Sequence, residues 1–184
     1  MVKYLYVILA CFFAAKGAAG QSLFEVNKGI VRFSSVAPHE LITAESKELK
    51  GALDSRKKSF AFKLPIASFK GFNSPLQREH FNENYMETEV YPFATFSGKI
   101  IEDLDIGKEG IYKVRAKGRL QIHGVVQERI INVEINNKGR EMTFRSSFII
   151  SLIDHSIKIP RVVYDKLAPD IKVSVDGILN QTAQ

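Results

Sequence analysis

Hydrophobic and polar residues alternate with a period of two through most of the chain, a pattern typical of β-strands that bury one face. The clearest case runs from residue 112 to residue 122. Every second side chain there is apolar or small, and the side chains between them are charged or amides. The apolar or small positions are Tyr112, Val114, Ala116, Gly118, Leu120 and Ile122. The segment therefore predicts a long strand with one dry and one wet face.

The same alternation predicts further strands, separated by turn signals. They lie within residues 29–35, 60–64, 94–100, 131–135, 142–152 and 171–177. Two of the turns contain residue types that tolerate positive φ, at 123–124 and at 136–139. Long strands joined by short turns predict an antiparallel meander.

A meander with one apolar face gains from closing into a barrel, because closure buries that face and removes exposed edges. We therefore predict an all-β fold, an extended antiparallel barrel of about eight strands, a size that holds side chains or one small ligand. Its inward face mixes large residues such as Phe62 with small ones such as Ser146. That mixture fits both a solid core and a cavity that holds a guest, and the pattern leaves both open.

One segment, residues 75–85, departs from the strand pattern and predicts a short helix. Ser74 can cap its N-terminus, Pro75 suits its first position, and Gln77 lies where a capping box requires it. Pro92 then favours an extended chain at the start of the next strand.

A helix of this length is not stable alone, so we expect it to dock on apolar ground. In a meander barrel that ground is an open end, and the helix is expected to act as a cap and gate. Phe81 would point inward. Arg78 or His80 would meet the polar head of a guest or a carbonyl at a strand end.

Residues 1–20 have the composition of a secretory signal peptide. A lysine near the start precedes an apolar run over residues 4–15, and small residues at Ala18 and Gly20 suit a cleavage site. The run is shorter than the roughly 20 apolar residues that span a bilayer. We therefore expect cleavage near Gly20, a single domain over residues 21–184, and a periplasmic or secreted protein.

Cys11 offers an alternative reading as a lipid anchor, although the apolar run continues past it. If cleavage follows Gly20, the mature chain has no cysteine, which excludes disulfides and thiolate chemistry. Removal of Lys3 and Lys16 also lowers the formal net charge from +6 to +4. The remaining charge is scattered, and its densest basic run, residues 56–58, falls at an expected turn. Weak contact with a membrane surface stays open, whereas no nucleic-acid partner is expected.

Several blocks of the sequence resemble the YceI-like family of bacterial envelope proteins. The helix block is Gln77-Arg78-Glu79-His80-Phe81, followed by Tyr91-Pro92-Phe93-Ala94-Thr95-Phe96. The central hairpin block is residues 118–125, and residues 51–54 resemble an early strand end of the family. Two positions depart from the pattern: Asn27-Lys28 stands where a His-Ser pair is common, and Ile149 stands where a glycine is common.

The resemblance implies a lipocalin-like barrel that carries a polyisoprenoid or another long apolar lipid, without chemistry. A bound isoprenoid quinone would be a ligand, and no cofactor or metal is expected. The protein would be a monomer or homodimer. The residues expected to line the ligand site are Phe62, Phe81, Phe96, Val114, Ala116, Gly118, Leu120, Phe144, Ser146, Phe148, Val173 and Val175, with Arg78 and His80 as contacts to a head group.

Two other classes of function stay open. An enzyme acting on envelope lipids would need reactive side chains, yet the four histidines have no metal-ligand spacing and no nucleophile has an obvious partner. His123 is expected in a turn and His155 in a polar loop. A structural or stress-response interaction protein would have a filled barrel. The interior volume distinguishes a carrier from such a protein.

Overall fold

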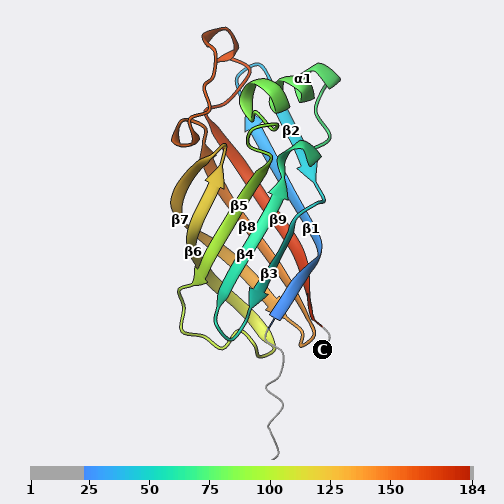
Figure 1. Cartoon of the computed structure of the whole chain (residues 1–184), viewed down its shortest axis with the longest axis vertical. Coiled ribbons are helices and arrows are strands. Elements are labelled where there is room, and N and C mark those ends of the chain that lie inside the picture. Colours follow the sequence, from blue (N-terminus) through green and yellow to red (C-terminus); the bar gives the residue numbers. More distant parts are fainter. Residues whose placement is uncertain (1–22, 183–184) are drawn as a thin grey trace, which may run out of the picture.

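The computed structural model describes residues 23–182, which form one antiparallel sheet that closes on itself (Figure 1). From β3 to β9, each strand pairs with its neighbour in sequence. The strands are β1 (Leu23–Val36), β2 (Leu41–Ser46), β3 (Lys50–Asp54), β4 (Ser59–Pro65), β5 (Phe93–Ile100), β6 (Gly110–Ile122), β7 (Val125–Asn137), β8 (Glu141–Ser151) and β9 (Asp170–Gln181).

Strand β1 closes the barrel because both of its edges are paired. One edge is joined to β9 between Phe24 and Ser34. The other edge is joined to β3 through Leu23–Glu25 and to β2 through Val31–Val36. The closed barrel therefore consists of eight strands, β1 and β3 to β9, and β2 extends one wall. The predicted all-β antiparallel barrel is confirmed.

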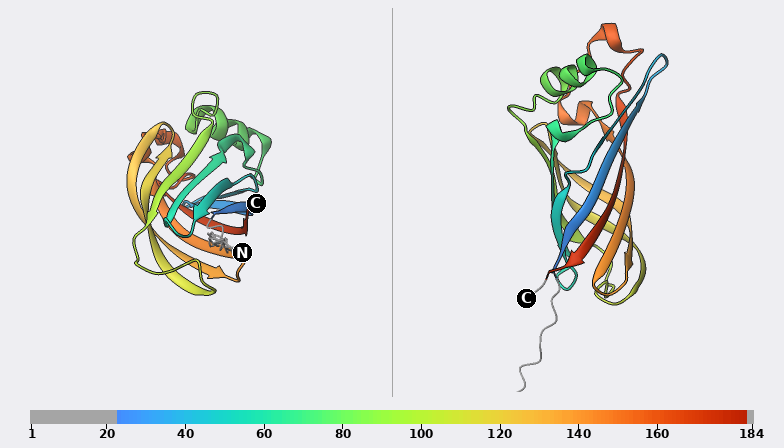
Figure 2. Two further views of the ribbon diagram at one scale, coloured as in Figure 1. Left: turned by 60° about the horizontal axis from the view of Figure 1, so that its bottom comes forward. Right: turned by 90° about the vertical axis from the view of Figure 1, so that its right-hand side faces the viewer.

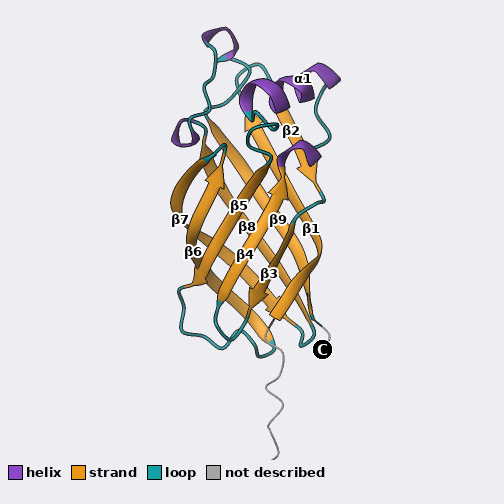
Figure 3. Cartoon of the chain, in the orientation of Figure 1, coloured by secondary structure: helices purple, strands orange, loops and turns teal. Residues whose placement is uncertain are grey.

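The helical segments of the described chain gather at one end of the barrel, which we call the capped end (Figures 2 and 3). Helix α1 (Pro75–His80) continues directly into a π-helical turn, η2 (Phe81–Tyr85). The predicted helix over residues 75–85 is thus confirmed. Three short 3₁₀ segments accompany it: η1 (Ile66–Ser68), η3 (Ile153–His155) and η4 (Arg161–Val163).

The N-terminus of α1 is capped as its sequence predicts, with one difference. Ser74 Oγ accepts a hydrogen bond from the Gln77 amide at 3.1 Å. Gln77 Oε1 reaches back to the amide of Asn73 at 3.0 Å rather than to that of Ser74. The second hydrogen bond of the capping box therefore goes to the amide of Asn73, one residue before the cap. It still gives a partner to a backbone amide near the start of the helix.

Packed side chains close the opposite end of the barrel, which we call the base. Phe24, Ile106, Met142 and Leu179 are each at most 2% exposed. Ile106 comes from the loop between β5 and β6, and its carbonyl accepts a hydrogen bond from Asn137 Nδ2 at 2.9 Å. This anchor holds the loop against the base.

The turns lie where the sequence placed them. His123 and Gly124 have φ angles of 50° and 74°, which suit the tight hairpin between β6 and β7. The basic run at residues 56–58 forms the turn between β3 and β4. The signal peptide predicted over residues 1–20 lies outside the described residues and stays a prediction. Within residues 23–182, no helix combines the length and the apolar character needed to cross a membrane.

Candidate ligand-binding cavity

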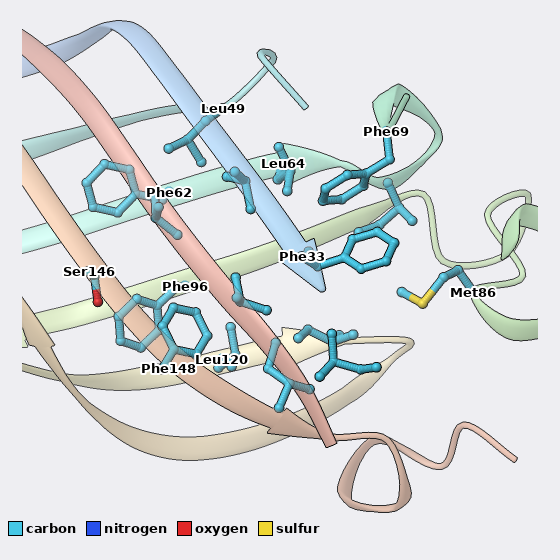
Figure 4. A pocket seen from close by; sticks show the side chains of 18 of the residues that line it. Phe33, Leu49, Phe62, Leu64, Phe69, Met86, Phe96, Leu120, Ser146 and Phe148 are labelled. Atoms are coloured by element: carbon cyan, nitrogen blue, oxygen red, sulfur yellow. The ribbon is translucent and has the colours of Figure 1, made fainter. Parts of the chain in front are cut away.

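The inward side chains of the barrel surround a cavity of about 570 Å³ (Figure 4). Because side chains alternate along a strand, each strand supplies every second residue to the lining. Strand β6, for example, supplies Val114, Ala116, Leu120 and Ile122. The lining is almost entirely apolar, and it extends from the helix at the capped end towards the base.

Aromatic rings form a waist halfway along the interior. Phe60 lies 4.9 Å from Phe96 between ring centroids, and Phe62 lies 5.5 Å from Phe144. Phe62, Phe96 and Phe144 contact both the core cluster of the base and the larger cluster of the capped end. Opposite Phe144, Gly177 has no side chain, and a Cβ there would overlap the phenylalanine ring. The absence of a side chain at Gly177 leaves the space that the Phe144 ring occupies in the waist.

A second aromatic cluster lies under the helix at the mouth of the cavity. Phe81, the first residue of η2, stacks on Phe33 at 5.5 Å and lies 5.0 Å from Phe72. Phe69 completes the cluster, 5.1 Å from Phe33. The helix therefore docks on the barrel through Phe81, which points inward as expected.

Polar groups at the mouth are few and come from separate elements. Gln77 Nε2 donates to Glu40 Oε1 at 2.8 Å, and both residues line the cavity. His80 and Lys166 also border it. Burial raises the pKa of the Tyr85 hydroxyl, which keeps it a neutral hydrogen-bonding group there. These few side chains are hydrogen-bonding groups at the edge of an otherwise apolar cavity.

Comparison of the sequence with models of known domain families finds a match. The YceI-like domain matches residues 24–178, nearly all of the described barrel. The chain belongs to the YceI-like family. The resemblance seen in the sequence blocks is therefore confirmed. A search of curated proteins finds no match.

Solved structures share the barrel of this YceI-like domain at low sequence identity. A polyisoprenoid-binding domain from Saccharophagus degradans superposes with a TM-score of 0.76 at 13% identity, covering 88% of this chain and 99% of that one. BcnA from Burkholderia cenocepacia gives 0.67 at 17% identity, with coverages of 82% and 95%. A YceI protein from Campylobacter jejuni gives 0.59 at 18%, with coverages of 75% and 84%. At such identities the likeness shows a shared fold.

Nearly all of the residues predicted to form the ligand site line the cavity. They are Phe62, Phe81, Phe96, Val114, Ala116, Leu120, Phe144, Ser146, Phe148, Val173 and Val175, and His80 borders the same space. Arg78 lies elsewhere. Its Nη2 donates to the carbonyl of Ala67 at 3.1 Å, which is the alternative role, a bond to a carbonyl near a strand end.

Gly118 also lies outside the cavity lining, contrary to its predicted place. It stands directly opposite Gly98 in the ladder between β5 and β6. A Cβ on Gly118 would overlap the carbonyl oxygen of Ser97, and a Cβ on Gly98 would overlap that of Lys117. The two glycines therefore let two strands approach closely. Alternation along a single strand cannot reveal such a contact, because it depends on the neighbouring strand.

The aromatic mouth was only partly foreseen. Phe33 lies in the alternating segment of residues 29–35 and lines the cavity. Its place in that alternation could have put it among the predicted ligand-site residues. Phe69 and Phe72 lie between η1 and α1, where the chain has no regular period. Periodicity therefore offers no signal for these two side chains, and only the packing against Phe81 shows their role.

The β6–β7 turn holds His123 by hydrogen bonds, the turn-bonding role expected for it. Its Nδ1 lies 3.1 Å from the carbonyl oxygen of His155, and its Nε2 lies 2.6 Å from Glu87 Oε2. The ring also packs edge-on against Tyr91 at 4.6 Å. These contacts fasten the turn to the segment that follows η2. Among residues 23–182, no group of three potential ligand side chains could hold a metal ion.

His155 is buried, so its placement in a polar loop was wrong. The side chain has no exposed surface, and neither ring nitrogen has a hydrogen-bond partner among the described residues. The ring lies near the backbone of Ile122 and Val125 without reaching hydrogen-bond geometry. Burial lowers its pKa, and the charge of Arg129 acts in the same direction. His155 is therefore a neutral packing residue beside the capped end.

Proposed function

We propose that this YceI-like domain is a carrier that holds one molecule with a long apolar tail and performs no chemistry on it. The observation that supports this most directly is the apolar cavity of about 570 Å³ beneath the capping helix. A volume of this size falls in the range of small-molecule sites, roughly 300–1,000 Å³. The likeness to a polyisoprenoid-binding domain from Saccharophagus degradans supports a polyisoprenoid or isoprenoid quinone as the ligand.

The physical basis is the removal of a hydrocarbon tail from water. Each buried methylene contributes about 0.8 kcal/mol, so a tail of moderate length supplies enough free energy for tight binding without polar contacts. The head group would remain at the mouth, within reach of His80, Lys166 and the Gln77–Glu40 pair.

The two other classes of function are less well supported. A filled barrel would suit an interaction protein, and the cavity volume argues against it. An enzyme would need a reactive pair in the cavity. In the described lining the only histidine is His80, which has no hydrogen bond to a nucleophile. We further propose that the carrier works outside the cytoplasm, as residues 1–20 suggest.

The decisive experiment is native mass spectrometry of protein purified from its own cell envelope, followed by solvent extraction of bound lipid. Ser146→Phe should fill the cavity and lower lipid occupancy, at a stability cost of about 1–3 kcal/mol for overpacking. Ser147→Phe is the matched control, because Ser147 is the next residue on β8 and is exposed. Wild-type occupancy in a folded Ser146→Phe variant would contradict an interior site.

A further inference from the structure

The seam between β7 and β8 is paired over less than half of its length. Backbone pairing joins Val133–Asn137 of β7 to Met142–Ser146 of β8. Towards the capped end, residues 125–132 and 147–151 have no ladder partners in each other. The other edges of the two strands are paired throughout, β7 with β6 and β8 with β9. The gap in pairing therefore belongs to this seam and not to frayed strands.

Side chains replace the missing ladder across this upper seam. Arg129 Nη2 donates to the carbonyl oxygen of Ile149 at 2.6 Å. Gln127 Nε2 donates to the carbonyl oxygen of Asp154 in η3 at 2.8 Å. Where the ladder ends, Ser146 Oγ donates to the carbonyl oxygen of Asn132 at 2.7 Å. A side-chain tether can rotate away while the strands on either side keep their own ladders.

The inner side of the upper seam is a wall of the cavity. Ile131 lines the cavity from β7, and Phe148 and Ile150 line it from β8. Parting of the two strands would therefore connect the apolar interior directly with the outside of the barrel. The two neighbouring seams, β6–β7 and β8–β9, are continuous ladders.

On the outer side of the upper seam, exposed apolar residues lie on both sides of each of these two tethers, Arg129 and Gln127. We call the two edges of the seam its lips. Ile130 and Ile149 flank the Arg129 tether and are 57% and 58% exposed. Val126 and Ile153 flank the Gln127 tether and are 40% and 80% exposed. Exposed apolar residues gathered around one opening are a feature of surfaces that meet a partner or a membrane.

Cationic residues border these lips. Lys117 stands opposite Ile130 in the β6–β7 ladder, and Lys172 stands opposite Ile149 in the β8–β9 ladder. Glu128, between the two apolar residues of β7, stands opposite Arg119. An apolar strip with lysines on both sides matches a bilayer whose head groups are anionic.

We propose that the upper β7–β8 seam is a lateral port through which the ligand passes between the cavity and an anionic bilayer docked on its lips. The proposal rests on the carrier function, because it supplies the passage that the same cavity needs. Arg129 and Gln127 act as latches that open without unfolding the barrel.

The test joins the lips covalently. Ile130→Cys and Ile149→Cys are combined in a Cys11→Ser chain and cross-linked with a short bismaleimide. The matched control is Ser147→Cys with Ser174→Cys, which stand opposite each other in the intact β8–β9 ladder. The probe is a pyrene-labelled long-chain lipid in vesicles of phosphatidylcholine and phosphatidylglycerol. Transfer rate and equilibrium occupancy are both measured.

Cross-linking the lips should slow transfer about tenfold, which corresponds to about 1.4 kcal/mol in the barrier. The control cross-link should leave the rate unchanged. Unchanged transfer across a closed seam would overturn the port while leaving the carrier function intact. If the uncross-linked protein takes up no probe at all, the carrier function fails and the port with it.

Two further variants test the latch and the docking surface. Arg129→Met should speed transfer, whereas Arg140→Met, in the turn at the base, should not. Ile130→Asn with Ile149→Asn should slow transfer to anionic vesicles without lowering equilibrium occupancy. Wild-type transfer rates in Arg129→Met would overturn the latch, and wild-type rates in the double variant would overturn the docking.

Discussion

His155 shows how much one side chain can depend on its tertiary surroundings. It follows Asp154 in a short segment after β8, yet it is fully buried and its pKa lies below the ordinary value. The unfolded chain binds a proton on this imidazole near its ordinary pKa of about 6.5. The folded protein takes up that proton only at a lower pH. Protonation therefore favours unfolding.

The free energy of unfolding should consequently be insensitive to His155 above about pH 6.5 and should fall as the pH drops below that value. His155→Leu removes the titrating group and should flatten this part of the pH dependence. Denaturant unfolding at a series of pH values checks the difference. His39→Leu, at an exposed position, is the control. Parallel pH profiles for the wild type and His155→Leu would contradict the assignment.

At the scale of elements, the stability of the helix α1–η2 depends more on the contact made by Phe81 than on the helix propensity of its residues. Its N-terminus is capped by Ser74, but it has only eleven residues and gains its stability by docking. Phe81 makes that contact with three other phenylalanines. Full truncation of a buried phenylalanine costs about 3–5 kcal/mol, and the half-buried Phe81 should cost less.

Phe81→Ala should therefore lower the melting temperature and weaken lipid binding, because the ring covers the mouth. Glu79→Ala, on the exposed side of the same helix, should change neither. A melting curve and a lipid titration measure both effects. Wild-type stability and affinity in Phe81→Ala would show that the helix does not cap the cavity. Its further role as a gate stays a prediction, which faster release from Phe81→Ala would support.

The sequence predicts elements better than it predicts how they meet. Alternation identified the inward residues of β6 and β8 because parity is a property of one strand. It misplaced Gly118, whose role depends on Gly98 across the ladder. It gave no signal for Phe69, which lies outside the regular strands. The partial seam between β7 and β8 was equally hidden, because a strand's pattern says nothing about how far its edge is paired.

At the scale of the whole molecule, the packed base sets the length of tail that the barrel can hold. Affinity should rise by about 0.8 kcal/mol per methylene while the tail still fits, and then level off. A series of prenyl alcohols of increasing length, measured by competition against a fluorescent lipid, tests this expectation. A continued rise with the longest chains would show that the tail passes through the base.

The predicted signal peptide also concerns the molecule as a whole. N-terminal sequencing of the protein recovered outside the cytoplasm should find Gln21 or Ser22 as the first residue. A retained Met1 or a lipid attached to Cys11 would contradict cleavage near Gly20. Replacing Ala18 and Gly20 with bulky residues should block processing, because the cleavage site requires small side chains.

The closing ladder between β1 and β9 has a consequence for how the protein folds. It pairs Gly29 with Gly177, so the two halves of the contact come from opposite ends of the chain. Contacts between residues so distant in sequence carry a large entropic cost of loop closure, and this cost slows folding. In the nascent chain, the edge of β1 that will pair with β9 stays unpaired until β9 has been synthesised. The barrel therefore cannot close, and its apolar interior stays accessible, until β9 has been made.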